Sequence, residues 1–214
     1  MRVRHLKIII ATVLLTSCNR TTDKINLGNV NYDSLRIVLE GMREEDQNIR
    51  RILVDSIGFD SPNAGPFIKK MMDIDKNNQK NIKVILDKYG WIEQSKIGTK
   101  AADAFFYIIQ HAEMELMDKW YPKFKRLADN GEANARQCAM MEDRLLMRKG
   151  ERQIYGTQAS DFRTDKKMAI WPIENPENVN ERRRKIGFKT TVEEYAKEID
   201  AIFDINEKLP NEQD

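Results

Sequence analysis

Apolar residues recur at steps of three and four over most of the chain, which is the spacing of one face of an α-helix. This pattern predicts helices over about Asp33–Ser56 and Phe67–Tyr89, separated by the proline- and glycine-containing stretch 58–66. A third helix begins near Thr99 and is apolar nearly all round over residues 101–109. A helix of that kind is expected to be the most buried element.

The pattern continues beyond this helix, which should run on toward Trp120. Pro122 is expected to kink or restart the chain before a short helix that ends at Asn130-Gly131. A further helix covers about residues 135–150. These segments complete the helical part of the pattern before its character changes.

Two short segments, Gln153–Gln158 and Met168–Ile173, read as the strands of a hairpin. Thr191 and Glu194 have capping-box spacing and begin a last helix. We therefore expect a mainly α-helical fold, a single domain of about five to six helices with a small β-hairpin over residues 32–209. The tail 210–214 should be loose.

The N-terminus has its own pattern, with three basic residues before the short and mostly apolar stretch Ile8–Leu15, which ends in Leu15-Thr16-Ser17-Cys18. It resembles a bacterial lipoprotein signal, in which residues 1–17 are removed and Cys18 carries acyl chains such as palmitate. Residues 18–31 would then be a lipidated cysteine and a flexible tether. An ordinary cleaved signal peptide is the alternative. The resemblance implies a protein of the bacterial envelope, periplasmic or surface-exposed, anchored to a membrane rather than spanning it.

Removal of Arg2, Arg4 and Lys7 with the signal lowers the basic residues from 36 to 33, against 34 acidic ones. Such a balance argues against a nucleic-acid partner, which needs an excess of clustered cations. Cys138 is the only thiol besides Cys18, so no disulfide within the mature domain is expected, and we expect Cys138 to be buried.

Some polar residues occupy positions where the helical pattern calls for apolar ones. Asp46 stands four residues after Met42, and Asp75 and Asn78 lie on the stripe of the second helix. These side chains either tie helices together through hydrogen bonds or line a cleft that binds a ligand.

His111 extends the inward face of the central helix, next to Gln110 and two residues before Glu113. A histidine oriented by a carboxylate suits general acid or base catalysis, while a packed core histidine is the structural alternative. No metal site is expected, because there is no second histidine nearby and no cysteine cluster. The sequence also lacks a phosphate-binding P-loop, and no cofactor is expected.

A second polar group lies further along the chain. Asp143 and Arg144 interrupt an apolar face, and at least one of Arg182 and Arg183 should face inward, where it could hold a carboxylate or phosphate. The nearby amide, phenol and hydroxyl groups belong to Gln153, Tyr155, Thr157 and Gln158. A turn held together by its own side chains is the alternative to a binding site.

Together these residues resemble the motifs of an uncharacterised bacterial family, a domain of unknown function with many exported members. The motifs are Asp75-x-x-Asn78, Tyr89-Gly90-Trp91, Gly98, Gln110-His111-Ala112-Glu113, Asp143-Arg144, Gly150-x-x-Gln153-x-Tyr155-Gly156-Thr157-Gln158 and Arg182-Arg183-x-x-x-Gly187. Ile92 and Glu113 stand where the family usually has proline and aspartate. The resemblance implies that these polar residues recur together, as residues of a shared site do.

Three functions remain open from the sequence. The leading one is a hydrolase or transferase in which His111 is the acid or base, Asp143 or Glu113 orients it, and Arg144 or Arg183 holds a negatively charged or cell-wall-derived substrate. The others are a non-catalytic module that binds a peptide, glycan or cell-wall fragment, and a purely structural lipoprotein. The sequence does not decide whether the protein is an enzyme.

Overall fold

The structure is a computed structural model that describes residues 31–163, 165 and 167–212. Cys18 and the expected signal and most of the tether lie outside these residues. The described chain is mainly helical with one small sheet, as the sequence predicts. Its helices are α1 (Tyr32–Arg51), α2 (Gly65–Tyr89), α3 (Gln94–Ile97), α4 (Thr99–Ile109), α5 (Met114–Asp129), α6 (Ala135–Arg148), α7 (Val179–Lys185) and α8 (Val192–Glu198). The antiparallel strands are β1 (Ala159–Ser160) and β2 (Ala169–Ile170).

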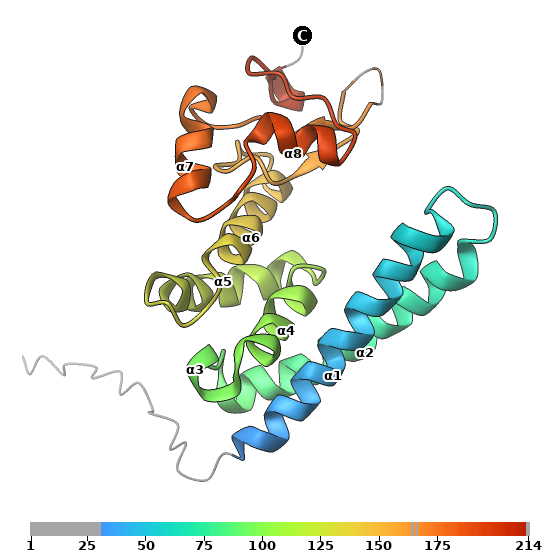
Figure 1. Ribbon diagram of the computed structural model, residues 1–214, viewed down its shortest axis with the longest axis vertical. Helices are drawn as coiled ribbons and strands as arrows, with labels where there is room; N and C mark the ends of the chain where they lie inside the picture. Colours follow the sequence, from blue (N-terminus) through green and yellow to red (C-terminus); the bar gives the residue numbers. More distant parts are fainter. Residues whose placement is uncertain (1–30, 164, 166, 213–214) are drawn as a thin grey trace, which may run out of the picture.

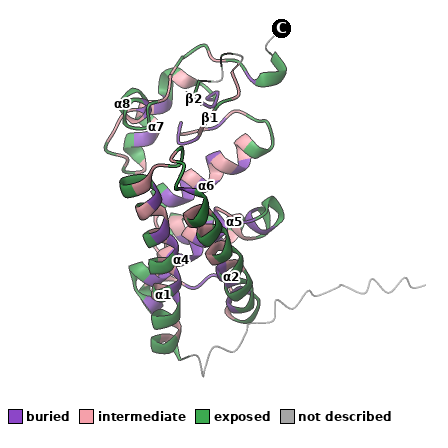
Figure 2. Cartoon of the chain, turned by 90° about the vertical axis from the view of Figure 1, so that its right-hand side faces the viewer, coloured by how far each residue is buried: buried purple, intermediate pink, exposed green. Residues whose placement is uncertain are grey.

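Helices α1 and α2 form a long hairpin, and α4 packs against both of them (Figure 1). Helices α5 and α6 pair with each other next to α4, and the sheet, α7 and α8 lie over the far end of α6. Figure 2 shows that the buried side chains follow the inner faces of these helices. The amphipathic pattern of the sequence therefore decides which face of each helix turns inward.

The main core contains an aromatic stack. The ring of Trp91 lies 5.4 Å from that of Phe105 and 4.3 Å from that of Phe124. Full burial of a side chain of this size stabilises the fold by about 1.5–3 kcal/mol. A second, smaller apolar cluster under α7 and α8 contains Ile170, Ile173, Val179, Val192 and Ala196. The C-terminal part therefore has its own packing, and α6 connects it to the main core.

Four elements differ from the prediction. The first helix ends in a π-helix, Ile52–Ile57. The third predicted helix stops at Ile109, and α5 then runs through Pro122 without the expected restart. Residues 153–158 form a loop instead of a regular strand, with a single bridge from Gln153 to Ile173 of the second predicted strand, and β1 follows them. These breaks, with the short helices α3 and α7, raise the number of α-helices in the described chain to 8, above the expected five to six.

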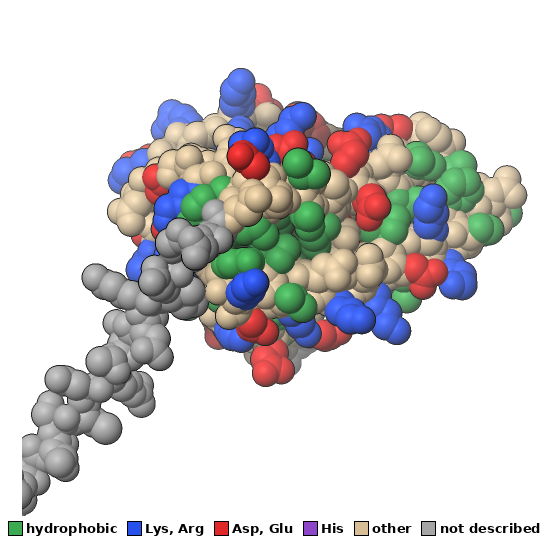
Figure 3. Space-filling view, turned by 90° about the horizontal axis from the view of Figure 1, so that it is seen from below, with side chains coloured by type: hydrophobic (Ala, Val, Ile, Leu, Met, Phe, Trp, Pro, Cys, Tyr) green, Lys and Arg blue, Asp and Glu red, His purple; other side chains and the backbone are tan. Residues whose placement is uncertain are grey.

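The expected loose tail is held as far as Glu212, because its segment Pro210–Glu212 forms a 3-10 turn and the Glu212 carboxylate pairs with Arg152 at 2.5 Å. Cys138 is buried as predicted, with 5% of its surface exposed. Among the residues that the structure describes, no helix combines the length and hydropathy needed to cross a membrane. Seen from the end where α1 begins, apolar side chains gather on the surface, surrounded by basic and acidic side chains (Figure 3).

Candidate functional site

The turn between α4 and α5 positions His111. Its three consecutive carbonyl groups accept hydrogen bonds from side chains of other helices: Gln110 from Arg144 at 3.5 Å, His111 from Gln79 at 3.3 Å, and Ala112 from Arg148 at 2.8 Å. The end of a helix leaves carbonyl groups without backbone partners, and basic side chains satisfy them well. Contacts from α2 and α6 therefore fix the turn and the position of the imidazole.

Charged residues of α1 and α2 meet on the other side of the histidine. The guanidinium of Arg50 donates to Asp46 at 3.2 Å and to Asp75 at 2.6 Å, so it links the two helices. Burial raises the pKa of Asp75, and the nearby charge of Asp46 adds to the increase. The Asn78 amide also joins the helices, donating to the Met42 carbonyl at 3.2 Å. Asp46 and Asn78 thus face inward as predicted, each with 1% of its surface exposed.

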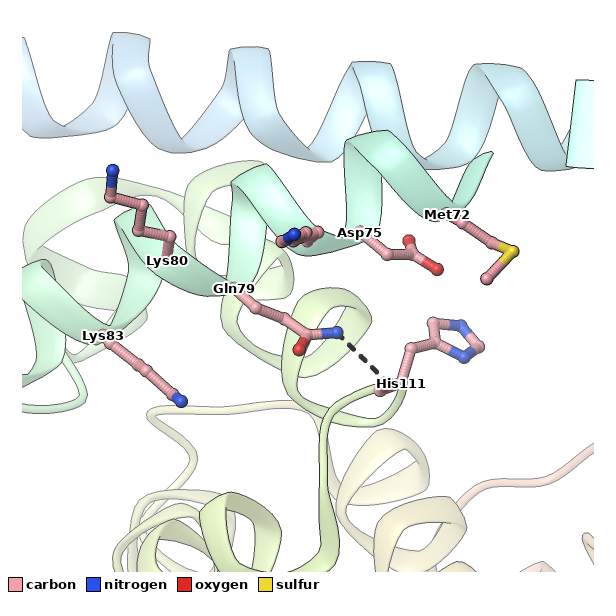
Figure 4. A pocket seen from close by; sticks show the side chains of 7 residues that line it. Met72, Asp75, Gln79, Lys80, Lys83 and His111 are labelled. Atoms are coloured by element: carbon pink, nitrogen blue, oxygen red, sulfur yellow. Dashed lines mark hydrogen bonds between the residues drawn. The ribbon is translucent and has the colours of Figure 1, made fainter. Parts of the chain in front are cut away.

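His111 and Asp75 line one pocket, which we call the His111 pocket. Its volume is about 480 Å³, and its lining consists of Met72, Asp75, Lys76, Gln79, Lys80, Lys83 and His111. Figure 4 shows the Asp75 carboxylate and the imidazole at one end of the pocket, with Lys80 and Lys83 farther along α2. Most of the lining residues are therefore charged or polar, and the pocket is open along one side of α2.

The environment of the imidazole is strongly positive. Burial and the charges of Arg50, Arg144 and Arg148 lower the pKa of His111 from 6.5 to about 3. The histidine is therefore neutral at pH 7, and it makes no hydrogen bond through its ring to any described residue. A neutral imidazole among guanidinium groups can accept a proton once a negative charge enters the pocket.

Arg144 is the most exceptional charge near the pocket. Its Nε is buried and has no hydrogen-bond partner in the described part of the chain, where the guanidinium makes a single hydrogen bond, at 3.5 Å to the Gln110 carbonyl. Burial lowers its pKa, and the like charges of Arg148 and Arg50 contribute to the decrease. Within residues 31–163 and 167–212, no carboxylate forms an ion pair with it. An uncompensated buried charge is costly, so a counter-ion would be stabilising here.

Asp143, the next residue along α6, faces a different part of the molecule. Its carboxylate accepts hydrogen bonds from the backbone N–H of Ile154 at 2.7 Å and Tyr155 at 3.0 Å, and from the N–H and hydroxyl of Thr157 at 3.0 and 2.8 Å. We call residues 153–158 the Asp143 loop. Burial raises the pKa of Asp143 to about 6, although these hydrogen bonds lower it.

The adjacent arginines of α7 hold the same loop from the other side. Arg182 donates to the Ile154 carbonyl at 2.9 Å, and Arg183 donates to the Tyr155 carbonyl at 2.9 Å and the Thr190 carbonyl at 2.9 Å. The Arg183 guanidinium also lies over the rings of Phe188 and Tyr195, 4.7 and 5.4 Å from their centroids. Burial lowers the pKa of Arg183.

Two glutamines close the Asp143 loop. Gln153 donates to the Gln158 carbonyl at 3.0 Å and accepts from the Gln158 N–H at 2.9 Å. The Gln158 amide donates to the Thr157 carbonyl at 3.1 Å. Gly156 has φ +67°, and a Cβ there would lie 2.7 Å from Val192 Cγ2. The loop is therefore held by its own glutamines together with Asp143 of α6 and the arginines of α7, an arrangement close to the structural alternative in the sequence analysis.

The predicted site residues thus fall into two groups. Asp75, Gln110, His111 and Arg144 gather around the His111 pocket or the turn that carries it, and Asn78 lies behind them at the α1–α2 contact. Asp143, Gln153, Tyr155, Thr157, Gln158 and Arg183 form the separate Asp143 loop and its clamp. The single cleft that the sequence analysis envisaged is therefore divided in two.

Two expectations about the partner of His111 need correction. Asp143 serves the loop, because both of its oxygen atoms accept hydrogen bonds from residues 154–157. Glu113 is exposed and borders a neighbouring pocket lined by Lys83, Asp87, Glu113, Glu115, Leu116, Lys119 and Trp120. The carboxylate that shares a pocket with the imidazole is Asp75. Likewise, Arg183 binds carbonyl groups of the loop, so of the two proposed anion holders only Arg144 faces the histidine.

Sequence reasoning missed several residues around the pocket: Arg50, Arg148, Lys76, Gln79, Lys80 and Lys83. A signal was present for the arginines, since Arg50 follows Asp46 by four residues and Arg148 follows Arg144 by four. Residues four apart lie on the same face of a helix. The lysines gave no signal, because an exposed basic stripe on a helix is usually a solvated face.

The protein is thus a small helical domain with a pocket lined by lysines around one neutral histidine. The described residues contain no cluster that could bind a metal ion. The chain belongs to the family of unknown function DUF6624, whose model matches residues 33–208. The match spans nearly the whole described domain and confirms the resemblance to an uncharacterised family. Searches of curated proteins and of solved structures found no significant match.

Proposed function

We propose that this protein binds an anionic ligand in the His111 pocket while tethered to a bacterial envelope membrane through lipid on Cys18. The observation that carries the proposal is the state of Arg144, a largely buried guanidinium with a buried Nε that has no partner among the described residues. Arg144 lies behind His111 and does not line the pocket, so a bound oxyanion would offset this charge at short range instead of pairing with its Nε.

The surrounding charges support the same ligand. Arg148 and Arg50 flank Arg144, and the two carboxylates on this side, Asp46 and Asp75, already pair with Arg50. The neutral His111 can donate or accept a hydrogen bond toward the ligand, since its ring makes none to described residues. Binding in this pocket needs no metal and no covalent step.

Binding is tested by isothermal titration calorimetry with inorganic phosphate as the probe. We expect saturable binding by the wild-type protein and loss of binding in Arg144→Met, which keeps much of the apolar stem of the side chain. Arg136→Met is the matched control, because Arg136 is an exposed arginine of the same helix. Equal binding by all three proteins, or none by the wild type, would overturn the proposal.

The tether has an independent test. Metabolic labelling with an alkyne fatty acid should tag the protein, and Cys18→Ala should remove both the label and the membrane association. Cys138→Ala is the control, since this thiol is buried in α6 and should not affect either readout. Unchanged labelling of Cys18→Ala would refute the lipid anchor.

A hydrolase or transferase acting on an anionic substrate is the second candidate. The observation that favours it is the presence of a carboxylate, Asp75, in the same pocket as His111 (Figure 4). An anionic substrate would raise the pKa of the imidazole toward the working range of a general base. Turnover of p-nitrophenyl phosphate that disappears in His111→Gln would support this function, and turnover that survives the substitution would refute it.

A further inference from the structure

The His111 pocket has an extended shape and more cations than a single anion needs. Besides His111, the lining includes three lysines of α2, Lys76, Lys80 and Lys83, while the arginines lie behind the histidine and outside the lining. These positions follow the helical spacing of four and three residues, so the three side chains leave the same side of α2. At a rise of 1.5 Å per residue, the row is about 10 Å long.

The lysines of this row have no acidic partners. None of the three forms an ion pair with a carboxylate of the described chain, whereas Lys69 on the same helix pairs with Asp73 at 2.9 Å. In Figure 4, Lys80 and Lys83 lie farther along α2 than Asp75 and His111, and their two side chains point away from each other. A ligand that bound only near Arg144 would leave these three ammonium groups without a negatively charged partner.

The row also has a defined end. Lys83 borders the neighbouring pocket, whose lining includes three carboxylates, Asp87, Glu113 and Glu115. A long polyanion that continued past Lys83 would meet these negative charges, and such contacts are unfavourable. These charges therefore favour a short ligand over a long polymer.

We infer that the ligand is a short chain of two to three phosphate groups, with one end at His111, in front of Arg144, and the rest along Lys76 and Lys80. This inference rests on the proposed function, because it assumes that an anion binds near Arg144. Phosphate suits the site, since each group offers several acceptor oxygens to ammonium and guanidinium donors. The same chemistry occurs in a free oligophosphate and in a lipid headgroup that carries two phosphates.

Calorimetry with inorganic phosphate and with tripolyphosphate tests the inference on the full-length protein. The wild type should bind tripolyphosphate about tenfold or more tightly than phosphate, the gain expected from two or three exposed ion pairs. In Lys76→Gln/Lys80→Gln tripolyphosphate should lose its advantage, so that the two affinities become equal within a factor of two. The control Lys69→Gln/Lys88→Gln removes the same charge from α2 outside the pocket lining and should retain the full difference.

The outcomes separate the two proposals. If the wild type binds neither anion, both the proposed function and the inference fail. If it binds phosphate in an Arg144-dependent manner but gains nothing with tripolyphosphate, only the inference fails. The same failure follows if the control variant loses as much affinity as the pocket variant, because the gain would then reflect net charge alone.

Vesicles distinguish the two sources of such a ligand. Phosphatidylcholine vesicles with and without cardiolipin are sedimented with Cys18→Ala protein and with the same protein carrying Lys76→Gln/Lys80→Gln. Cardiolipin-dependent capture that the lysine substitutions remove identifies a lipid headgroup as the source. If tripolyphosphate binds tightly while cardiolipin has no effect, the ligand is a soluble oligophosphate. Both results support the oligophosphate inference.

Discussion

Replacement of Asp143 by alanine should destabilise the protein strongly. The side chain is fully buried, and its removal leaves the N–H groups of Ile154, Tyr155 and Thr157 without their acceptor. Each buried donor left unsatisfied costs about 1–3 kcal/mol, and relief of the buried negative charge offsets part of the sum. We therefore expect a loss of about 3–5 kcal/mol in the free energy of unfolding.

Urea unfolding followed by tryptophan fluorescence measures this loss. With a slope of about 2 kcal/mol per molar urea, the midpoint should fall by roughly 2 M. The control is Asp118→Ala, which removes an exposed carboxylate paired with Lys149 at 2.8 Å. A surface pair of this kind contributes about 0–1 kcal/mol. If Asp143→Ala changed the midpoint no more than the control does, Asp143 would not be the organiser of the loop.

Three further predictions follow from individual residues. Gly156→Ala should lower the free energy of unfolding by about 2–4 kcal/mol, because the positive φ of this residue is strained for alanine. The new Cβ would also lie 2.7 Å from Val192 Cγ2 and 2.8 Å from Ile173 Cδ1. A melting temperature within about 2 °C of wild type would contradict this prediction. Cys138 should react with a maleimide only after unfolding, since burial raises its pKa to about 12, and rapid labelling of the native protein would refute the assignment. Because the pKa of His111 is lowered on folding from 6.5 to about 3, the unfolded state binds more protons in this range, so stability should fall as the pH decreases from 6.5 toward 3. Between pH 7 and pH 4 this loss amounts to roughly 3 kcal/mol, and His111→Gln should remove it; an identical pH profile for the variant would show that another group is responsible.

The periodic pattern predicted the helices because each buries one apolar face, and that property is local. The break after Ile109 was not predictable in this way. It depends on Gln79, Arg144 and Arg148, which bind the carbonyl groups of the turn from more than 30 residues away in the chain. A six-residue π-helix also leaves an apolar pattern that is too short to distinguish from an α-helix.

The division of the predicted site has a geometric cause. Successive residues of an α-helix point about 100° apart, since 3.6 residues complete a turn. Asp143 and Arg144 therefore leave α6 in different directions, one toward the Asp143 loop and the other toward His111. The sequence identified polar residues that face inward, but the direction in which each one faces depends on the tertiary packing. Residues 153–158 depart from the predicted strand for the same reason. The ends of this segment bond to the second predicted strand, at Gln153 and Gln158, but the residues between them donate to a carboxylate of α6.

The pKa of the His111 imidazole measures most directly whether an anion binds beside His111 and Arg144. The chain has 2 histidines, so the NMR signal of His111 is identified by its absence in His111→Gln. A pH titration of this signal is recorded with and without saturating sulfate, an oxyanion whose charge stays constant over the range. We expect a pKa of about 3 without sulfate and an increase of at least one unit with it, because the anion offsets the charges of Arg50, Arg144 and Arg148. A pKa near 6.5 without sulfate, or one that sulfate leaves unchanged, would contradict it.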